Sequence, residues 1–273
     1  MPQGVPFSKF TPPANTGLGF LELVTDADIL AMADPEDGDK DGISGIPNWI
    51  KIPHYVEIRQ NTIVQKDKYI GRFGKKASVY NLLQQTANAY NQDMGITSNF
   101  EPYDTYSGHE IDPEVSNQTL QNVVFYLQTL KAPLPRDEKN PDIVAGKQIF
   151  QTLNCGACHR PELKTGASST AVLAHKTFHP YTDLLLHDMG TALDDGYTEG
   201  GAKTAEWRTP PLWGLGLSKI SQGGQYFLMH DGRAKGVEAA ILLHGGEAEK
   251  SKNQYTALTQ HEKQKLIQFL ESL

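Results

Sequence analysis

Cysteine is scarce in this sequence: the 273 residues include two, and both lie in the stretch Asn154-Cys155-Gly156-Ala157-Cys158-His159. That placement excludes the disulfide framework that holds many small secreted domains together. No apolar run approaches the roughly 20 residues that a membrane-spanning helix needs, so we expect no span of the bilayer. Residues 1–6 have neither a basic nor an apolar stretch and show no secretory signal.

Basic residues are also in the minority. The sequence has 25 Lys and Arg against 32 Asp and Glu, a net charge of −7. Nucleic acids and anionic membranes favour proteins with an excess of positive charge, so we expect neither as the main partner. A basic protein partner stays open. The length and a hydrophobic fraction of 38% are enough for two domains of ordinary size.

Helical periodicity dominates what is present. Apolar residues recur at helical spacing in several segments, while the connections between them are rich in Gly and Pro and contain few convincing strands. The segments with helical character are 26–32, 77–90, 116–130, 142–153, 236–244 and 259–273. The sequence therefore predicts a mainly α fold with long irregular loops.

Two of these segments, 116–130 and 259–273, resemble each other. Each opens with a Ser or Thr suited to an N-cap, carries an aromatic residue next to Leu, and has apolar residues at helical spacing. The proline-rich, charged stretch between the two halves reads as a linker. We place domains at 1–132 and 142–273, with the linker at 133–141.

The pattern Cys-x-x-Cys-His is the most specific feature of the chain. Its spacing lets the thiols of Cys155 and Cys158 add to the two vinyl groups of one haem, while the imidazole of His159 reaches the iron as the proximal ligand. A redox dithiol or half of a zinc site is the alternative, but zinc would need further Cys or His at finger-like spacing. We predict one covalent c-type haem.

A cytochrome c domain is bracketed by a helix before this motif and a closing helix that crosses it. Residues 142–273 have both helices, and Gly146 would allow them to cross closely. Segment 116–130 looks like a closing helix with no opening partner upstream, so we expect the chain to begin inside a first, incomplete cytochrome-like domain. Because covalent haem attachment takes place outside the cytoplasm, we expect a periplasmic protein whose signal is not in this sequence.

Several further motifs resemble the di-haem oxidoreductase family of peroxidase-like proteins, which is related more distantly to bacterial di-haem cytochrome c peroxidases. The resemblance covers nearly the whole chain and implies a redox protein with two haems. This sequence has one Cys-x-x-Cys-His motif and lacks the first. Besides that motif, the residues that carry the resemblance are 18–22, 34–45 with 47–48, 72–74, 93–97, 179–190, 207–214, 230–233 and 244–247.

The sixth ligand of the iron must come from elsewhere, and a Met or a His there sets the reduction potential. In the related peroxidases, an aromatic-His-Asp-Gly type of turn is followed by a short helix whose end supplies this ligand, and the resemblance places His244 at that position. Met189 is the alternative. The other candidates are Met229, His179, His187 and His230. Ligation by His159 and His244 would saturate the iron and suit electron transfer.

Two arginines, Arg208 and Arg233, could neutralise haem propionates through forked hydrogen bonds, although surface ion pairs are the commoner fate of arginine. Trp207 and Trp213 would pack near the haem or fill the core. The haem itself calls for a redox protein as electron donor or acceptor.

The acidic loop 34–45 places Asp37, Asp39 and Asp41 at alternate positions, with glycine next. In an EF-hand-like turn this spacing wraps oxygen ligands around a hard cation, and the Ile43 carbonyl would follow as a further ligand. Asn48 stands where a bidentate Glu is expected. A solvated Asp/Gly turn is the alternative to calcium, and three close carboxylates without a counter-ion would repel one another.

Three functions remain open at this point. The first is a peroxidase-like redox enzyme whose haem on this chain passes electrons to a catalytic haem. The second is a non-catalytic electron carrier with one haem. The third is a metal-binding structural module without redox activity. Peroxide turnover needs an iron with an open position and acid–base groups, which a bis-histidine site does not offer; whether the chain is an enzyme is left open.

Overall fold

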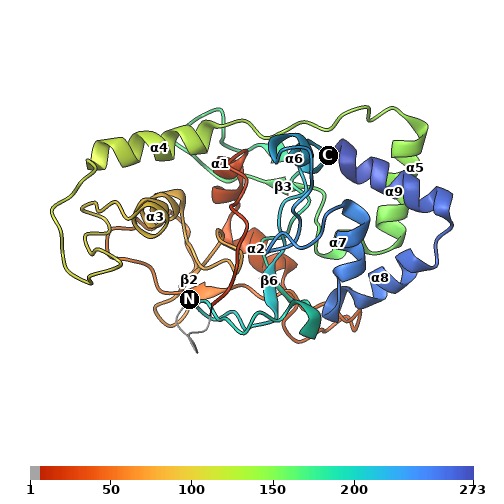
Figure 1. The fold of residues 1–273 in the computed structure, drawn as a ribbon, viewed down its shortest axis with the longest axis horizontal. Helices are drawn as coiled ribbons and strands as arrows, with labels where there is room; N and C mark the ends of the chain where they lie inside the picture. Colours follow the sequence, from red (N-terminus) through yellow and green to blue (C-terminus); the bar gives the residue numbers. More distant parts are fainter. Residues whose placement is uncertain (1–6) are drawn as a thin grey trace.

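Helices dominate residues 7–273, the part of the chain that the computed structural model describes (Figure 1). The α-helices are α1 (Leu18–Glu22), α2 (Asp26–Met32), α3 (Leu82–Asn88), α4 (Asn117–Thr129), α5 (Pro141–Thr152), α6 (Leu215–Ser221), α7 (Val237–Leu243), α8 (Glu249–Thr256) and α9 (Gln260–Ser272). Long irregular connections join them, as the sequence predicts. No helix among these residues is long and apolar enough to cross a bilayer.

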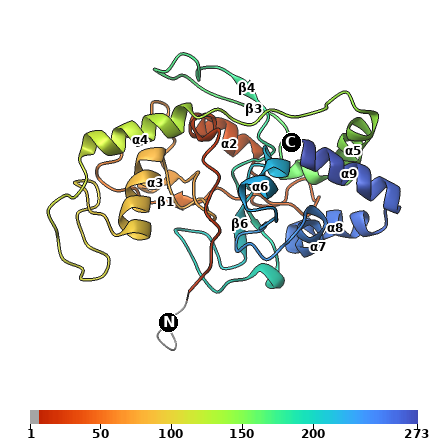
Figure 2. The same cartoon turned by 45° about the horizontal axis from the view of Figure 1, so that its top comes forward.

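The strands in the described residues form antiparallel two-stranded sheets, each from two or three residues a strand. They pair β1 (Trp49–Ile50) with β2 (Tyr69–Ile70), β3 (Leu163–Lys164) with β4 (Thr177–Phe178), and β5 (Leu186–Asp188) with β6 (Glu206–Arg208). Figure 2 shows β3 and β4 projecting as a hairpin at one edge of the molecule. The last pair, β5–β6, is mostly buried, and β5 contacts the 3₁₀ turn at Gly246–Ala248 that follows α7.

Helices α5 and α9 cross at Gly146. A Cβ on this glycine would lie 2.1 Å from the Lys265 carbonyl oxygen and 2.7 Å from the Phe269 Cβ, so a larger residue could not occupy the crossing. Both helix starts are capped: the Asn140 side chain accepts from the Asp142 amide, and Thr259 forms a reciprocal capping box. The predicted close crossing at Gly146 is confirmed, and it fixes the direction in which α5 delivers the cysteines.

Helix α4 packs against α1 and α3 on the other side of the molecule (Figure 1). Here Gly19 of α1 provides the close approach, because a Cβ on it would lie 2.0 Å from the Gln128 carbonyl oxygen. No upstream helix was predicted to cross segment 116–130. In the structure α1, which is only five residues long, crosses it. Whether this half is an incomplete cytochrome-like domain stays a prediction.

The helix predicted at 77–90 begins later than expected. Ala77 has a φ of 51°, in the left-handed region, so the helix cannot include it. The Asn81 side chain accepts a hydrogen bond from the Gln84 amide and starts α3 instead, and a π-helical turn at Ala89–Asp93 extends the helix beyond its predicted end.

The two largest hydrophobic clusters of residues 7–273 lie in different parts of the fold. One gathers α1, α2 and the loops around Phe73 and Leu185, together with Phe178 and Trp213, and so draws on residues before and after 133–141. The other lies between α5, α7, α8 and α9 around Phe150 and Phe269, with Cys155 packed against it. The division of the chain into domains at 133–141 stays a prediction.

Candidate haem site

The Cys-x-x-Cys-His motif forms a tight turn at the end of α5. Asn154 adopts a φ of 59° and turns the chain, and the 3₁₀ turn at Cys155–Ala157 then presents both cysteines as free thiols. Burial raises the pKa of the Cys155 thiol to about 12, so the group is neutral near pH 7. Beneath the turn, the rings of Phe150, Tyr181 and Phe269 pack edge to face.

His159 is oriented by a backbone carbonyl. Its Nδ1 lies 3.0 Å from the Tyr181 oxygen, and because a carbonyl can only accept, Nδ1 carries the proton. Tyr181 itself has a φ of 56°, a conformation that costs free energy in a non-glycine residue and aims this carbonyl at the ring. Burial and the neighbouring His244 lower the pKa of His159 to about 4. The ring is therefore neutral and has Nε2 left for a ligand.

His244 has the same arrangement at the end of α7. Its Nδ1 donates to the Ala240 carbonyl at 2.7 Å, and burial lowers its pKa. Among the hydrogen bonds of residues 7–273, Nε2 of neither histidine takes part. A neutral imidazole whose Nδ1–H is held by a carbonyl is the form that binds a metal through Nε2. Each of the two histidines is therefore in a state that fits ligation of a haem iron through Nε2.

A buried charged network lies against the second cysteine. His187 Nε2 lies 2.8 Å from Asp183 Oδ2, and its Nδ1 lies 2.6 Å from Glu247 Oε2 and 3.4 Å from the Cys158 sulfur. Burial would lower the pKa of His187, but its hydrogen bonds outweigh burial and raise the pKa well above the usual value. His187 is thus a cation held between two carboxylates.

Asp183 and Glu247 were not among the residues predicted for this site. Both occur in stretches that carry the family resemblance, at 179–190 and 244–247, but the chain around residue 183 is irregular and gives no periodicity from which a side-chain direction could be read. The approach of Asp183 to His187 over four residues was the one local signal available.

The chain is similar to a known protein family over nearly its whole length. The model of the family described as "Di-haem oxidoreductase, putative peroxidase" matches residues 9–273. This chain belongs to the di-haem oxidoreductase family. Membership supports haem as the cofactor and oxidoreductase chemistry. A comparison with curated proteins finds no match.

Among solved structures, Kuenenia stuttgartiensis hydrazine synthase pressurised with xenon is similar to this protein over 100% of this chain and 95% of that one. The TM-score is 0.40 and the identity 14%. A likeness at this level has no bearing on the site.

The predicted alternatives for the sixth iron ligand lie in different surroundings. His187 is held by carboxylates, and the His230 ring stacks on Trp207 with the centroids 3.7 Å apart. His179 is exposed, with Nδ1 3.3 Å from the Pro161 oxygen. Half-buried Met189 lies on the segment that runs beside His244, since a Cβ on Gly245 would approach the Met189 oxygen to 2.9 Å.

The two predicted propionate arginines already have protein partners. Arg208 donates from Nε to the Gly74 oxygen at 2.9 Å, and burial lowers its pKa to about 10. Arg233 pairs with Asp231 at 2.7 Å and also donates to the Ala192 oxygen. Their role toward a haem stays a prediction. Trp213 packs in the first hydrophobic cluster, in keeping with the core-filling interpretation.

The acidic loop lies beside the haem motif. The carboxylates that approach one another to within 4.8 Å are those of Asp34, Asp37 and Asp39. The predicted ligand Asp41 instead accepts from the Ile43 amide at 2.8 Å and from Asn154, next to Cys155, at 3.5 Å. The predicted role of the Ile43 carbonyl is not tested by these contacts, and the ligand set of the loop stays a prediction.

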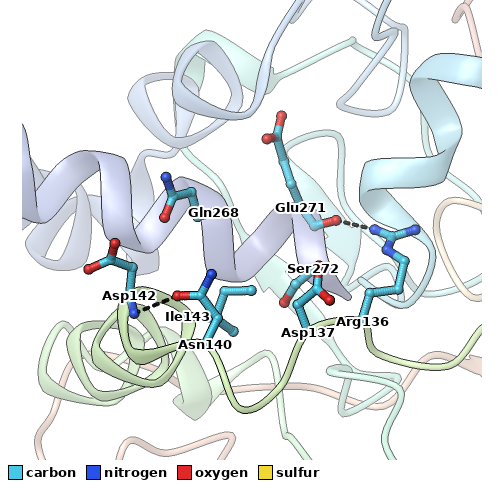
Figure 3. A pocket seen from close by; sticks show the side chains of 8 residues that line it. All are labelled: Arg136, Asp137, Asn140, Asp142, Ile143, Gln268, Glu271 and Ser272. Atoms are coloured by element: carbon cyan, nitrogen blue, oxygen red, sulfur yellow. Dashed lines mark hydrogen bonds between the residues drawn. The ribbon is translucent and has the colours of Figure 1, made fainter.

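A shallow polar pocket of about 280 Å³ lies elsewhere, where the start of α5 meets the end of α9 (Figure 3). Arg136 donates to the Glu271 carbonyl at its rim, and the Asn140 cap of α5 forms part of its wall. None of its lining residues is a candidate for the haem site. The pocket is a feature of the helix crossing.

Proposed function

We propose that this protein holds one covalent c-type haem on Cys155 and Cys158, with His159 and His244 as the iron ligands, in a cytochrome-c-like arrangement of α5 and α9. The observation that carries the proposal is the matched state of the two histidines: each is neutral, and each has Nδ1 fixed by a backbone carbonyl. The haem would supply reversible one-electron chemistry.

The protein's own residues give this haem its surroundings. The edge-to-face rings around Phe150 pack under the turn that would carry the haem, and the charged network of His187 contacts Cys158. An iron with two protein ligands has no position free for peroxide, so the site serves electron transfer to or from a redox protein. The same feature supports the second candidate, a non-catalytic mono-haem electron carrier.

Because covalent haem attachment takes place outside the cytoplasm, we propose that the protein works in the periplasm. The test is therefore periplasmic expression together with the haem-attachment machinery, followed by haem staining on a denaturing gel and a pyridine haemochrome spectrum. We expect one covalent haem per chain, absent in Cys155→Ala/Cys158→Ala. Protein that binds no haem covalently would overturn the proposal and favour the structural-module alternative.

The ligand assignment has its own test. His244→Ala should convert a low-spin ferric spectrum to high-spin, whereas Met189→Ala should leave the spectrum unchanged. The reverse result would make Met189 the ligand. Peroxidase turnover by the intact wild-type chain would overturn the electron-transfer role.

We further propose that the acidic loop binds calcium. Three carboxylates within 4.8 Å and left-handed backbone at Asp37 and Gly42 support a loop folded around a cation. Calorimetric titration of chelator-treated protein should show one calcium site that is lost in Asp37→Asn. The exposed Asp28, at the N-terminal end of α2, gives the matched control Asp28→Asn, which should bind as the wild type does.

A further inference from the structure

Glu247 makes more hydrogen bonds than a surface glutamate ordinarily does. Oε1 accepts from the Ser44 hydroxyl at 2.6 Å and the Asp188 amide at 3.2 Å, and Oε2 accepts from the Ser44 amide at 3.1 Å and His187 Nδ1 at 2.6 Å. Burial would raise the pKa of Glu247, but the bonds from His187 and Ser44 outweigh burial and lower the pKa. One carboxylate thus joins the acidic loop, β5 and the 3₁₀ turn at Gly246–Ala248.

The backbone between His244 and Glu247 is laid directly on β5. A Cβ on Gly246 would lie 2.2 Å from the Asp188 oxygen, and Gly246 has a φ of 53°, which favours glycine. A Cβ on Gly245 would lie 2.9 Å from the Met189 oxygen. These two glycines let the segment approach β5 closely, and Glu247 fastens its far end there.

His244 is therefore held from both sides. On the N-terminal side, its Nδ1–H donates to Ala240 within α7. On the C-terminal side, three residues on, Glu247 ties the chain to β5 and to Ser44. Groups that bind no metal themselves commonly fix the direction of a ligating histidine, and their loss lowers metal affinity or activity by about 10- to 100-fold.

We propose that Glu247 is the positioning residue that keeps His244 on the haem iron, and so keeps the iron closed to small external ligands. This inference rests on the proposed ligation by His159 and His244. With the carboxylate removed, the four donors lose their acceptor, the segment 244–247 is released from β5, and the sixth position of the iron opens part of the time.

The experiment compares holo-proteins with Glu247→Ala, Glu247→Gln and the control Glu249→Ala. Glu249 is exposed on α8 and has one ion pair, with Lys252 at 3.5 Å. We expect Glu247→Ala to show a high-spin component in the ferric spectrum and a cyanide affinity that rises in proportion to the fraction of open iron, about tenfold for a tenfold rise in that fraction. Glu247→Gln should show a smaller change, because an amide keeps one acceptor oxygen. Glu249→Ala should match the wild type.

A structural role alone would give a different result. A lower melting temperature of Glu247→Ala with an unchanged low-spin spectrum and cyanide affinity would overturn the positioning role. If Glu247→Ala does not yield holo-protein, Glu247→Gln decides by the same two readouts.

His244→Ala separates the two proposals. If His244→Ala leaves the spectrum low-spin, the ligation itself is wrong. If His244→Ala becomes high-spin while the Glu247 variants bind cyanide as the wild type does, the ligation stands and the positioning role falls.

Discussion

Two helix pairs of this protein, α5 with α9 and α1 with α4, are packed by the same kind of contact but lead into different structures. In each, a glycine lets the backbone of the closing helix approach to a distance that no Cβ could share, at Gly146 in one pair and Gly19 in the other. Yet α5 leads into the cysteine turn, whereas α1 leads into α2 and a buried ion pair of Asp26 with Arg72. The crossing packs two helices, and the turn that follows decides the chemistry.

The ion pair should give the largest effect on stability. Arg72 is buried, its pKa is lowered by burial to about 9, and its Nε and Nη1 have no partner in residues 7–273. Arg72→Met would leave Asp26 buried without its cation and should cost about 3–5 kcal/mol. Urea denaturation followed by circular dichroism measures this, with Asp26→Asn/Arg72→Met as the control that should recover part of the loss. Equal stability of Arg72→Met and wild type would contradict the assigned pairing.

The glycines test whether the two crossings are equivalent. Gly146→Ala and Gly19→Ala should each cost about 3 kcal/mol, because the added methyl group meets a backbone carbonyl rather than a mobile side chain. Only Gly146→Ala should also disturb the haem spectrum, since α5 carries the cysteine turn. If Gly19→Ala disturbed the haem spectrum and Gly146→Ala did not, the assignment of the haem to the α5–α9 pair would be wrong.

The stability contributed by the contacts of Lys75 should depend on pH. Lys75 donates to Thr11 at 2.8 Å, and its own carbonyl accepts from the amide of Arg208 in β6. Burial, with Arg208 nearby, lowers the pKa of Lys75 to about 8. Between about pH 8 and 10.5 the unfolded chain therefore binds more protons at Lys75 than the folded chain does. The free energy of unfolding rises with pH in that window, and the gain is absent below about pH 8.

Lys75→Met should accordingly stabilise the protein by about 2 kcal/mol at pH 7 and flatten this pH dependence. Denaturation midpoints at pH 7 and pH 10 measure both effects. If the stability of Lys75→Met and that of the wild type changed equally between pH 7 and pH 10, Lys75 would titrate normally.

The helix starts give the smallest expected difference. Thr259 and Glu262 cap α9 reciprocally, whereas Ser116 caps α4 from one side only, through the Thr119 amide. Thr259→Ala should cost about 1 kcal/mol and Ser116→Ala less. Thermal melts of the two variants rank them, and a larger loss in Ser116→Ala would reverse the comparison.

Much of the helical structure was predictable from the sequence, because its signals are local. The caps at Ser116 and Thr259 mark the starts of α4 and α9, and the spacing of Cys155 and Cys158 predicts haem without any tertiary contact. The start of α3 was not predictable, since apolar spacing continues through Ala77 while its backbone is left-handed.

The surroundings of the candidate site were not predictable, because they depend on distant contacts. Asp183 and His187 meet Glu247 across about 60 residues of chain, through irregular segments whose side-chain directions follow no period. The same holds for the stacking of His230 on Trp207, a contact that no local pattern in the sequence indicates.

The hydrogen bond between Ser44 and Glu247 joins residues 203 positions apart. Contacts of such sequence separation cost more chain entropy to form than local ones and slow folding. The stretch that carries the cysteines and both candidate iron ligands therefore depends on loop 34–45 for part of its surroundings. A fragment that begins at the proposed linker would contain every residue of the candidate ligand set and still lack one wall of the site.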